Sequence, residues 1–164
     1  MTVQQFCESL YGKAIYAAKT LDINPLIVLS QWALETNWGN SESYIKGHNL
    51  AGTETTQGNL GVYPNLSVGI HQYVSDMLND CPNIRDHQAN PTSTVDEVFF
   101  SNDYNPSPTY PTRIQAILTD NVEPWWRDSS APVNTKTFHG SFGTVTVSWQ
   151  FEKAPYHFDV TLEQ

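Results

Sequence analysis

The chain has 164 residues, 39% of them hydrophobic and 15% charged, which fits one domain with room for a small appendage and excludes a disordered chain. Its formal net charge of −9 argues against nucleic acid as a partner, because nucleic-acid binding depends on clustered Lys and Arg. The first residues have neither a basic start nor an apolar run, so no signal peptide is expected, and no membrane span is visible. Two cysteines do not make a disulfide framework, and we expect Cys7 and Cys81 to be buried free thiols.

The first two predicted helices differ in how their apolar residues are arranged. Residues 2–20 place apolar side chains at helical spacing, which predicts an amphipathic helix. Residues 24–39 predict a central helix that is apolar nearly all round, with Asn24 as its N-cap, Pro25 in its first position and Gly39 as the residue that ends it. This segment is too short to span a bilayer.

Glu35 is the only charged residue between Pro25 and Gly39. It falls in the last predicted turn, where the helix dipole disfavours a carboxylate, and the neighbouring Trp32 and Trp38 would remove it from water. Both effects raise the pKa of a carboxyl group, as a general acid near neutral pH requires. A Glu that ends the helix and points into water is the alternative that this pattern leaves open.

Short helices and polar loops are expected in the middle of the chain. In order, we expect a short helix or turn at 41–46, a β-hairpin or loop over the Gly-rich residues 47–64, an amphipathic helix over 66–78 that is stopped by Pro82, a short helix opened by a capping box at Thr94, and a further helix that begins at Pro111.

The pattern changes beyond the last of these helices. Residues 129–134 are typical of a linker, and residues 145–151 and 156–162 alternate apolar and polar side chains, which predicts a β-hairpin with one apolar face. We therefore expect a helical domain over 1–128 and an appendage over 129–164. Because an apolar face of this size needs a cover, the hairpin is expected to dock on the helical domain or to mediate self-association through an open strand edge.

Four segments, in chain order, carry a resemblance to a known family. They are LSQWALETNWGNS at residues 29–41, HNLAG at 48–52, VYPN at 62–65 and SNDYNPSPTYPTRI at 101–114. Together they resemble the glucosaminidase family 73 glycoside hydrolases, which include bacterial autolysins, flagellar rod-assembly hydrolases and phage lysins. The first segment is the most specific of the four.

The resemblance implies both a fold and a site. The fold is α+β and mainly α: a lysozyme-like helical domain with a small β-hairpin at the cleft, to which the C-terminal β-hairpin is added. Glu35 falls on the family's general acid, and Tyr63 and Tyr110 fall on tyrosines near the cleft, with Tyr110 expected among the catalytic residues. Core packing is the alternative role for both tyrosines.

The second carboxylate is where this chain departs from the family. The family usually carries it on a longer hairpin, whereas here the interval between Asn49 and Tyr63 is short and Glu54 is its only acidic residue. Glu54 is therefore the expected base or nucleophile. Asp103 is expected to be a substrate-binding residue and is the reserve candidate for the second carboxylate. Ala51 replaces the usual aromatic residue of the family's second segment.

The implied reaction is cleavage of the peptidoglycan glycan strand after N-acetylglucosamine, without a metal or other cofactor. Trp38, Tyr63 and Tyr110 are expected to offer flat faces to sugar rings, and Asn49 a hydrogen bond. Without a signal peptide, the protein would reach the bacterial cell wall by phage delivery or another export route. The alternatives are a lytic transglycosylase or muramidase on the same fold, a virion or surface component that binds glycan without cutting it, and an amidase or peptidase that uses Cys7.

Overall fold

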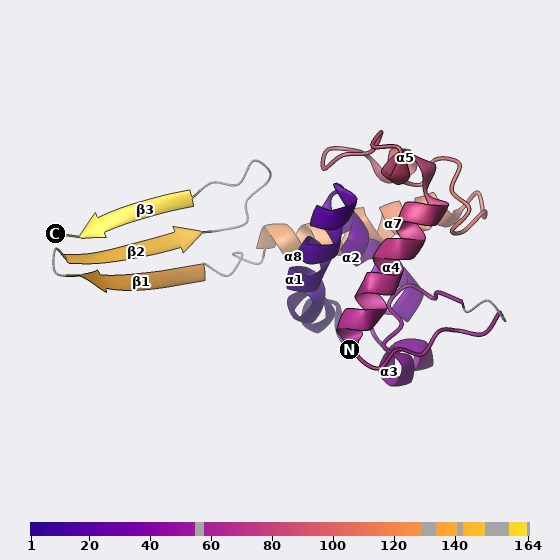
Figure 1. The fold of residues 1–164 in the computed structure, drawn as a ribbon, viewed down its shortest axis with the longest axis horizontal. Helices are drawn as coiled ribbons and strands as arrows, with labels where there is room; N and C mark the ends of the chain where they lie inside the picture. Colours follow the sequence, from indigo (N-terminus) through magenta and orange to yellow (C-terminus); the bar gives the residue numbers. More distant parts are fainter. Residues whose placement is uncertain (55–57, 129–133, 141–142, 150–157, 164) are drawn as a thin grey trace. The chain divides into compact units, whose positions relative to one another are not determined.

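The computed structural model describes residues 1–54, 58–128, 134–140, 143–149 and 158–163 (Figure 1). The chain divides into two compact units, Met1–Glu123 and Pro124–Gln164. The predicted boundary after residue 128 falls at the end of the helix α8 (Glu123–Asp128). No helix in the described part of the chain is both long enough and apolar enough to cross a membrane.

The first unit is built around α2 (Pro25–Thr36), which packs against α1 (Val3–Leu21) and α7 (Tyr110–Ile117). The Asn24 side chain caps α2 by accepting a hydrogen bond from the Leu26 amide at 2.9 Å, and Pro25 occupies the first turn, both as predicted. Most of the helix is buried, and Trp32 is fully enclosed. The centre of the core is therefore the helix that carries Glu35.

The C-terminal end of α2 is not where the sequence suggested. The helix ends at Thr36, and Asn37, Trp38 and Gly39 follow it with φ of 47°, 57° and 74°. Asn37 is the C-cap, so Gly39 continues a left-handed run and is not the residue that ends the helix. A positive φ is common for Gly and tolerated by Asn, but it is strained for a large side chain such as Trp38.

Most other helices begin at the caps that the sequence contains. Thr2 caps α1 with a full capping box, Ser41 caps α3 (Glu42–Gly47), Asn65 caps α4 (Leu66–Asp80), and Thr94 caps α6 (Val95–Val98) with the predicted capping box. Pro82 was predicted to stop the preceding helix, and α4 ends before it. Pro82 is also the first residue of a further short helix, α5 (Pro82–Arg85).

The helix predicted from Pro111 begins one residue earlier, at Tyr110, and continues further than expected. After α7 the backbone widens into a π-helical turn, η1 (Leu118–Val122), and then returns to α geometry in α8. No pattern in the sequence predicts the π turn. It keeps Leu118 and Val122 buried in the same continuous helical segment.

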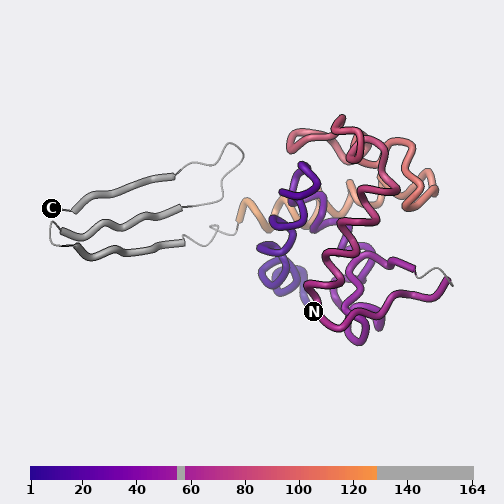
Figure 2. The backbone as a smooth tube through the Cα atoms, in the orientation of Figure 1, coloured from indigo at the N-terminus to yellow at the C-terminus, as the bar shows by residue number. Residues whose placement is uncertain are grey.

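Residues 48–54 lead away from α3, and residues 58–65 lead back to α4 (Figure 2). Their two arms are joined by hydrogen bonds from the Gly61 amide to the Thr53 carbonyl and from the Tyr63 amide to the Gly47 carbonyl, both at 2.8 Å. An isolated β-bridge links Glu54 with Leu60. Residues 55–57 lie outside the described part, and the hairpin at the cleft stays a prediction.

The second unit contains a three-stranded antiparallel sheet in the order β1 (Asn134–Gly140), β2 (Gly143–Trp149) and β3 (Phe158–Glu163). The register pairs Val145 with Phe138 on one side and with Leu162 on the other. The first strand was not predicted. The predicted C-terminal hairpin includes residues 150–157, which lie outside the described part, so the hairpin as a whole stays a prediction, as do its docking and its self-association.

Candidate active site

Glu35 lies partly buried in the last turn of α2, and its two carboxyl oxygens have different surroundings. Oε1 accepts a hydrogen bond of 2.8 Å from the Tyr110 hydroxyl. Burial raises the pKa of Glu35 above its ordinary value of 4.5, and the Tyr110 hydrogen bond and the charge of Arg113 only partly oppose this. The carboxyl group is therefore set to keep its proton at a higher pH than a surface Glu would.

Tyr110 is held from behind by buried polar groups. Its hydroxyl accepts a hydrogen bond of 3.0 Å from Nε2 of Gln31, which lies one turn before Glu35 on α2. Oε1 of Gln31 in turn accepts a hydrogen bond of 2.7 Å from the hydroxyl of Tyr73 on α4. Burial and the Glu35 charge raise the pKa of Tyr110 well above 10, so its hydroxyl stays protonated and can donate.

The other oxygen of Glu35 faces the turn formed by residues 49–53. Gly52 has a φ of 64°, and a Cβ placed on it would lie 2.9 Å from Oε2 of Glu35. The Tyr104 hydroxyl donates a hydrogen bond to the Ala51 carbonyl and so ties this turn to the segment before α7. Glycine at position 52 thus allows the backbone to approach the predicted acid closely.

Asn49 holds the turn together from the inside. Its Nδ2 donates to the carbonyls of Thr53 and Gly61 at 2.8 and 3.1 Å, and its Oδ1 accepts from the amides of Ala51 and Thr53 at 3.3 and 3.1 Å. Asn49 is 1% exposed. These contacts favour a structural role over the hydrogen bond to substrate that the sequence analysis assigned to it.

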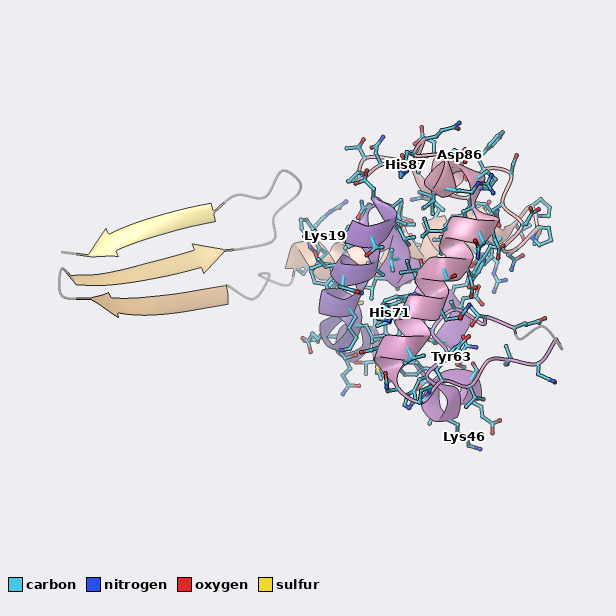
Figure 3. All side chains as sticks on the ribbon, viewed as in Figure 1. Lys19, Lys46, Tyr63, His71, Asp86 and His87 are labelled. Carbon is cyan, nitrogen blue, oxygen red and sulfur yellow. The ribbon has the colours of Figure 1, made fainter. Side chains whose placement is uncertain are left out.

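Tyr63 lies beside α4 (Figure 3). Its hydroxyl is 2.5 Å from Oγ1 of Thr53, and its ring lies against Gly69 of α4. The ring is only partly buried. Tyr63 therefore supports the turn next to Glu35, and part of its surface remains open to a ligand.

The remaining predicted residues are not brought into contact with Glu35 by any interaction in the described part of the chain. Trp38 is partly buried and packs edge-on against Phe6 of α1, with ring centroids 5.5 Å apart. Glu54 is exposed at the start of the arm beyond Thr53. Asp103 is exposed, its backbone amide bonds to the Asp80 carbonyl at 2.7 Å, and its charge acts on Cys81 and Arg85.

Thiol chemistry gains no support from the geometry. Cys7 and Cys81 are both free and buried, as predicted, and burial raises the pKa of each to about 12. At neutral pH both are therefore thiols and poor nucleophiles. Among the described residues, no group of three or more His, Cys, Asp or Glu side chains is arranged to hold a metal ion.

A scan against protein families matches residues 11–123 to the Glucosaminidase family, described as mannosyl-glycoprotein endo-beta-N-acetylglucosaminidase. The match covers Glu35, the turn at 49–53 and Tyr110. The chain belongs to the glucosaminidase family. It is a glycoside hydrolase by this membership, in agreement with the resemblance carried by its motifs. A search of curated proteins found no match to this glucosaminidase.

Solved structures with the same fold come from a bacterial enzyme. The glucosaminidase is similar to a peptidoglycan hydrolase from Sphingomonas sp. A1, with a TM-score of 0.60 and 19% identity over 80% of this chain and 97% of that one. A mutant of peptidoglycan hydrolase from the same organism matches with a TM-score of 0.58 and 18% identity over 76% of this chain and 98% of that one. These likenesses confirm the mainly helical, lysozyme-like fold.

Several residues around the predicted acid of this glucosaminidase were not predicted from the sequence. They are Gln31, Gly52, Tyr73, Tyr104 and Arg113. A signal existed for Gln31, because it is a polar residue in an otherwise apolar helix and lies four positions before Glu35, on the same face. Tyr73 had no such signal, because its contact with Gln31 depends on how α4 packs.

Proposed function

We propose that this glucosaminidase is a peptidoglycan hydrolase that cleaves the glycan strand after N-acetylglucosamine, with Glu35 as its general acid. The observation that carries the proposal is the environment of Glu35: a partly buried carboxyl group, raised in pKa, with one oxygen tied to Tyr110 and the other next to a glycine. A general acid must keep its proton near neutral pH and then give it to the leaving oxygen. Family membership and the peptidoglycan hydrolases of the same fold support the substrate class.

In this mechanism Glu35 protonates the glycosidic oxygen while the sugar carbon becomes oxocarbenium-like. Tyr110 acts as a catalytic residue by donating its hydrogen bond to Oε1, which stabilises the carboxylate that remains after proton transfer. Tyr63 and Trp38 are proposed to contact sugar rings. The acid's partner is proposed to be Glu54, which lies just beyond the turn that faces Glu35, with Asp103 as the reserve.

The deciding experiment is digestion of purified peptidoglycan by Glu35→Gln, which keeps the shape of the side chain and removes its acidic proton. We expect activity to fall by about 10²–10⁴-fold, the usual contribution of a general acid. Glu42→Gln is the matched control, because Glu42 is exposed on α3 and pairs only with Lys46 in the described contacts. Full activity in a folded Glu35→Gln protein would overturn the assignment.

Mass analysis of the new chain ends identifies the bond that is cut. Reducing N-acetylglucosamine ends are expected. Reducing N-acetylmuramic acid ends would indicate a muramidase, anhydro ends a lytic transglycosylase, and wall binding without new ends a non-catalytic component of a virion or cell surface. Any of these three results would replace the proposed activity.

The role of Glu54 needs its own variant, Glu54→Gln. A base or nucleophile in this position should be as sensitive as the acid, so we expect a comparable loss of activity. The anomer first released then reports the separation of the carboxyl groups, since retaining enzymes hold them about 5–5.5 Å apart and inverting enzymes about 6.5–9.5 Å apart. An unchanged rate in Glu54→Gln would exclude it and direct the same test to Asp103.

A further inference from the structure

A buried row of hydrogen-bonded side chains lies behind Glu35. The direction of these hydrogen bonds, from donor to acceptor, determines which oxygen of the acid carries the proton. The row runs from Tyr73 through Gln31 and Tyr110 to Glu35, with donor–acceptor distances of 2.7, 3.0 and 2.8 Å. Tyr73 and Gln31 are fully buried and Tyr110 is 1% exposed. Water therefore does not compete for these bonds, and each group must find its partners within the protein.

The orientation of the Gln31 amide follows from its neighbours. Its nitrogen lies 3.6 Å from the sulfur of Met77 as well as 3.0 Å from the Tyr110 oxygen. A thioether sulfur can only accept a hydrogen bond, so the amide group beside it must be the NH₂. The carbonyl oxygen of Gln31 then faces the Tyr73 hydroxyl, which donates to it. Met77 and Tyr73, both on α4, thus fix the amide in one orientation.

This orientation leaves Tyr110 one way to use its single hydrogen. Because Gln31 Nε2 can only donate, the Tyr110 oxygen accepts from it, and the Tyr110 hydrogen must point to Oε1 of Glu35. An oxygen that accepts this hydrogen bond is a poor place for the acid's own proton. The proton of neutral Glu35 therefore belongs on Oε2, the oxygen that faces Gly52.

We propose that Gln31 is a positioning residue of the glucosaminidase: through Tyr110 it keeps the proton of Glu35 on Oε2, where a leaving oxygen can receive it. The proposal rests on Glu35 being the general acid. If Gln31 could not donate, the Tyr110 oxygen would be free to accept a hydrogen bond from Glu35. The acid proton could then turn inward onto Oε1, away from the substrate.

The direction of the hydrogen bonds in the row also sets the sign of a pH effect. In the intact row Tyr110 is reserved as a donor, and a donor favours the ionised form of Glu35. Once Tyr110 can also accept, the protonated form gains a partner and the pKa of Glu35 rises. The other groups that act on Glu35 are Arg113 on α7, whose charge lowers this pKa, and the tyrosines Tyr73, Tyr104 and Tyr110, which remain neutral because burial raises their own pKa values.

The test is Gln31→Met in the full chain, which keeps an unbranched side chain of similar length and removes both polar groups. We expect the alkaline limb of the pH–rate profile to move up by about one pH unit, and kcat on the acidic plateau to fall about tenfold, less than the loss of the acid itself. The pKa of Glu35, followed by carbon NMR of labelled Glu side chains, should rise by a similar amount.

Ser30→Ala is the matched control. Ser30 is also a fully buried polar residue of α2, but its hydroxyl bonds to the Leu26 carbonyl at 2.7 Å and does not belong to the row. Its removal should leave both the pH profile and the Glu35 pKa unchanged. An equal shift in Ser30→Ala would mean that any damage to the buried part of α2 produces the effect, and would overturn the proposal.

A double variant separates positioning from general disruption. In a Tyr110→Phe background the intermediate hydroxyl is absent, so adding Gln31→Met should produce no further shift in the pKa of Glu35. Additive shifts would overturn the proposal. Tyr73→Phe, which removes one of the two groups that orient the amide and leaves Met77, provides an independent test if Gln31→Met is unstable. It should shift the pKa of Glu35 in the same direction by a smaller amount, and no shift would count against the row.

Failure of this proposal and failure of the proposed function are distinguishable. If Glu35→Gln abolishes cleavage while Gln31→Met leaves the pH profile unchanged, Glu35 is the acid and Gln31 does not position its proton. If Glu35→Gln remains active, the acid assignment itself is wrong, and the NMR measurement still reports whether Gln31 controls the ionisation of Glu35.

Discussion

At the scale of single residues, the site works by treating the two oxygens of Glu35 differently. Oε1 is tied to Tyr110, and Oε2 is approached by the backbone of Gly52 with no side chain between them. The space beside Oε2 therefore exists because Gly52 has a hydrogen atom where any other residue has its Cβ. This makes Gly52 as informative a position for mutation as Glu35 itself.

Gly52→Ala should remove activity for a steric reason. The added Cβ would lie 2.9 Å from Oε2 of Glu35, so the turn or the carboxyl group must move. Gly58→Ala is the control, because Gly58 also has a positive φ, of 74°, but no atom of the described residues lies within 4 Å of its Cβ position. Both variants carry the left-handed backbone cost of about 1–2 kcal/mol, seen as a similar loss in thermal stability. Only Gly52→Ala should lose peptidoglycan hydrolysis, and equal activities would contradict the close approach.

The raised pKa of Glu35 also predicts a stability effect with a defined sign. A carboxyl group whose pKa is higher in the folded state stabilises the fold below its ordinary value of 4.5, and this contribution is lost as pH rises through the folded-state pKa. Glu35→Gln, which does not titrate, should therefore unfold at a higher temperature than the parent at neutral pH, and the difference should shrink below pH 4.5. Calorimetry at several pH values measures this, and a difference independent of pH would contradict it.

At the scale of elements, the position of the turn at 49–53 depends on how closely α4 approaches the chain before it. A Cβ placed on Gly69 would collide with the carbonyl oxygen of His48, and it would also meet the ring of Tyr63 at 3.2 Å. Gly69 is therefore a contact point between α4 and the segment that leads into the turn, and its missing side chain lets the two backbones touch.

Gly69 on α4 and Gly12 on α1 should respond in opposite ways to alanine. Gly69→Ala should lower the free energy of unfolding by several kcal/mol and reduce activity, because a backbone oxygen cannot move aside as a flexible side chain can. Gly12→Ala should raise it by about 0.5–1 kcal/mol, because Gly12 lies on the exposed side of α1 with nothing near its Cβ position. Denaturant unfolding of both variants checks this, and similar effects from both would show that α4 can shift away from His48.

The elements also show what could be read from the sequence. The starts of α2 and α6 were predictable, because Asn24 and Thr94 are residues whose side chains cap the helix that follows them in the sequence. The end of α2 at Thr36 was not, since Asn37 and Trp38 adopt left-handed backbone conformations that the chain accepts only in its folded context. Among site residues, Glu35 and Tyr110 stood out by motif, whereas Tyr73 and Tyr104 entered through packing between segments far apart in the chain.

At the scale of the whole molecule, the family match and the candidate site both lie within the first compact unit. The match ends at residue 123, where that unit also ends, and every interaction of Glu35 described above involves residues 31–113. The sheet formed by β1, β2 and β3 contributes none of these residues. The described contacts of Glu35 therefore do not depend on the sheet, and its contribution to activity has to be tested separately from that of Glu35.

A chain that ends after Asp128 should fold and retain glycan cleavage. The core around α2 is complete in this fragment, and α8 is kept to its last residue. We expect hydrolysis of soluble peptidoglycan fragments close to that of the full chain, together with a lower thermal stability if the C-terminal unit docks on the helices. Loss of activity in a truncated chain that keeps its helical circular dichroism would show that the second unit contributes to the site, and loss of a dimer would favour self-association.

The left-handed backbone of Trp38 has a consequence for the history of this sequence. One nucleotide change converts the tryptophan codon to a glycine codon, and glycine would relieve about 1–2 kcal/mol of backbone strain at this position. This single-nucleotide change from tryptophan to glycine can arise by mutation in any generation. In this chain the side chain of Trp38 must offset the strain, through its edge contact with Phe6 and its partly exposed ring beside the acid's helix. Relatives that lose this ring should drift to glycine or asparagine at the same position.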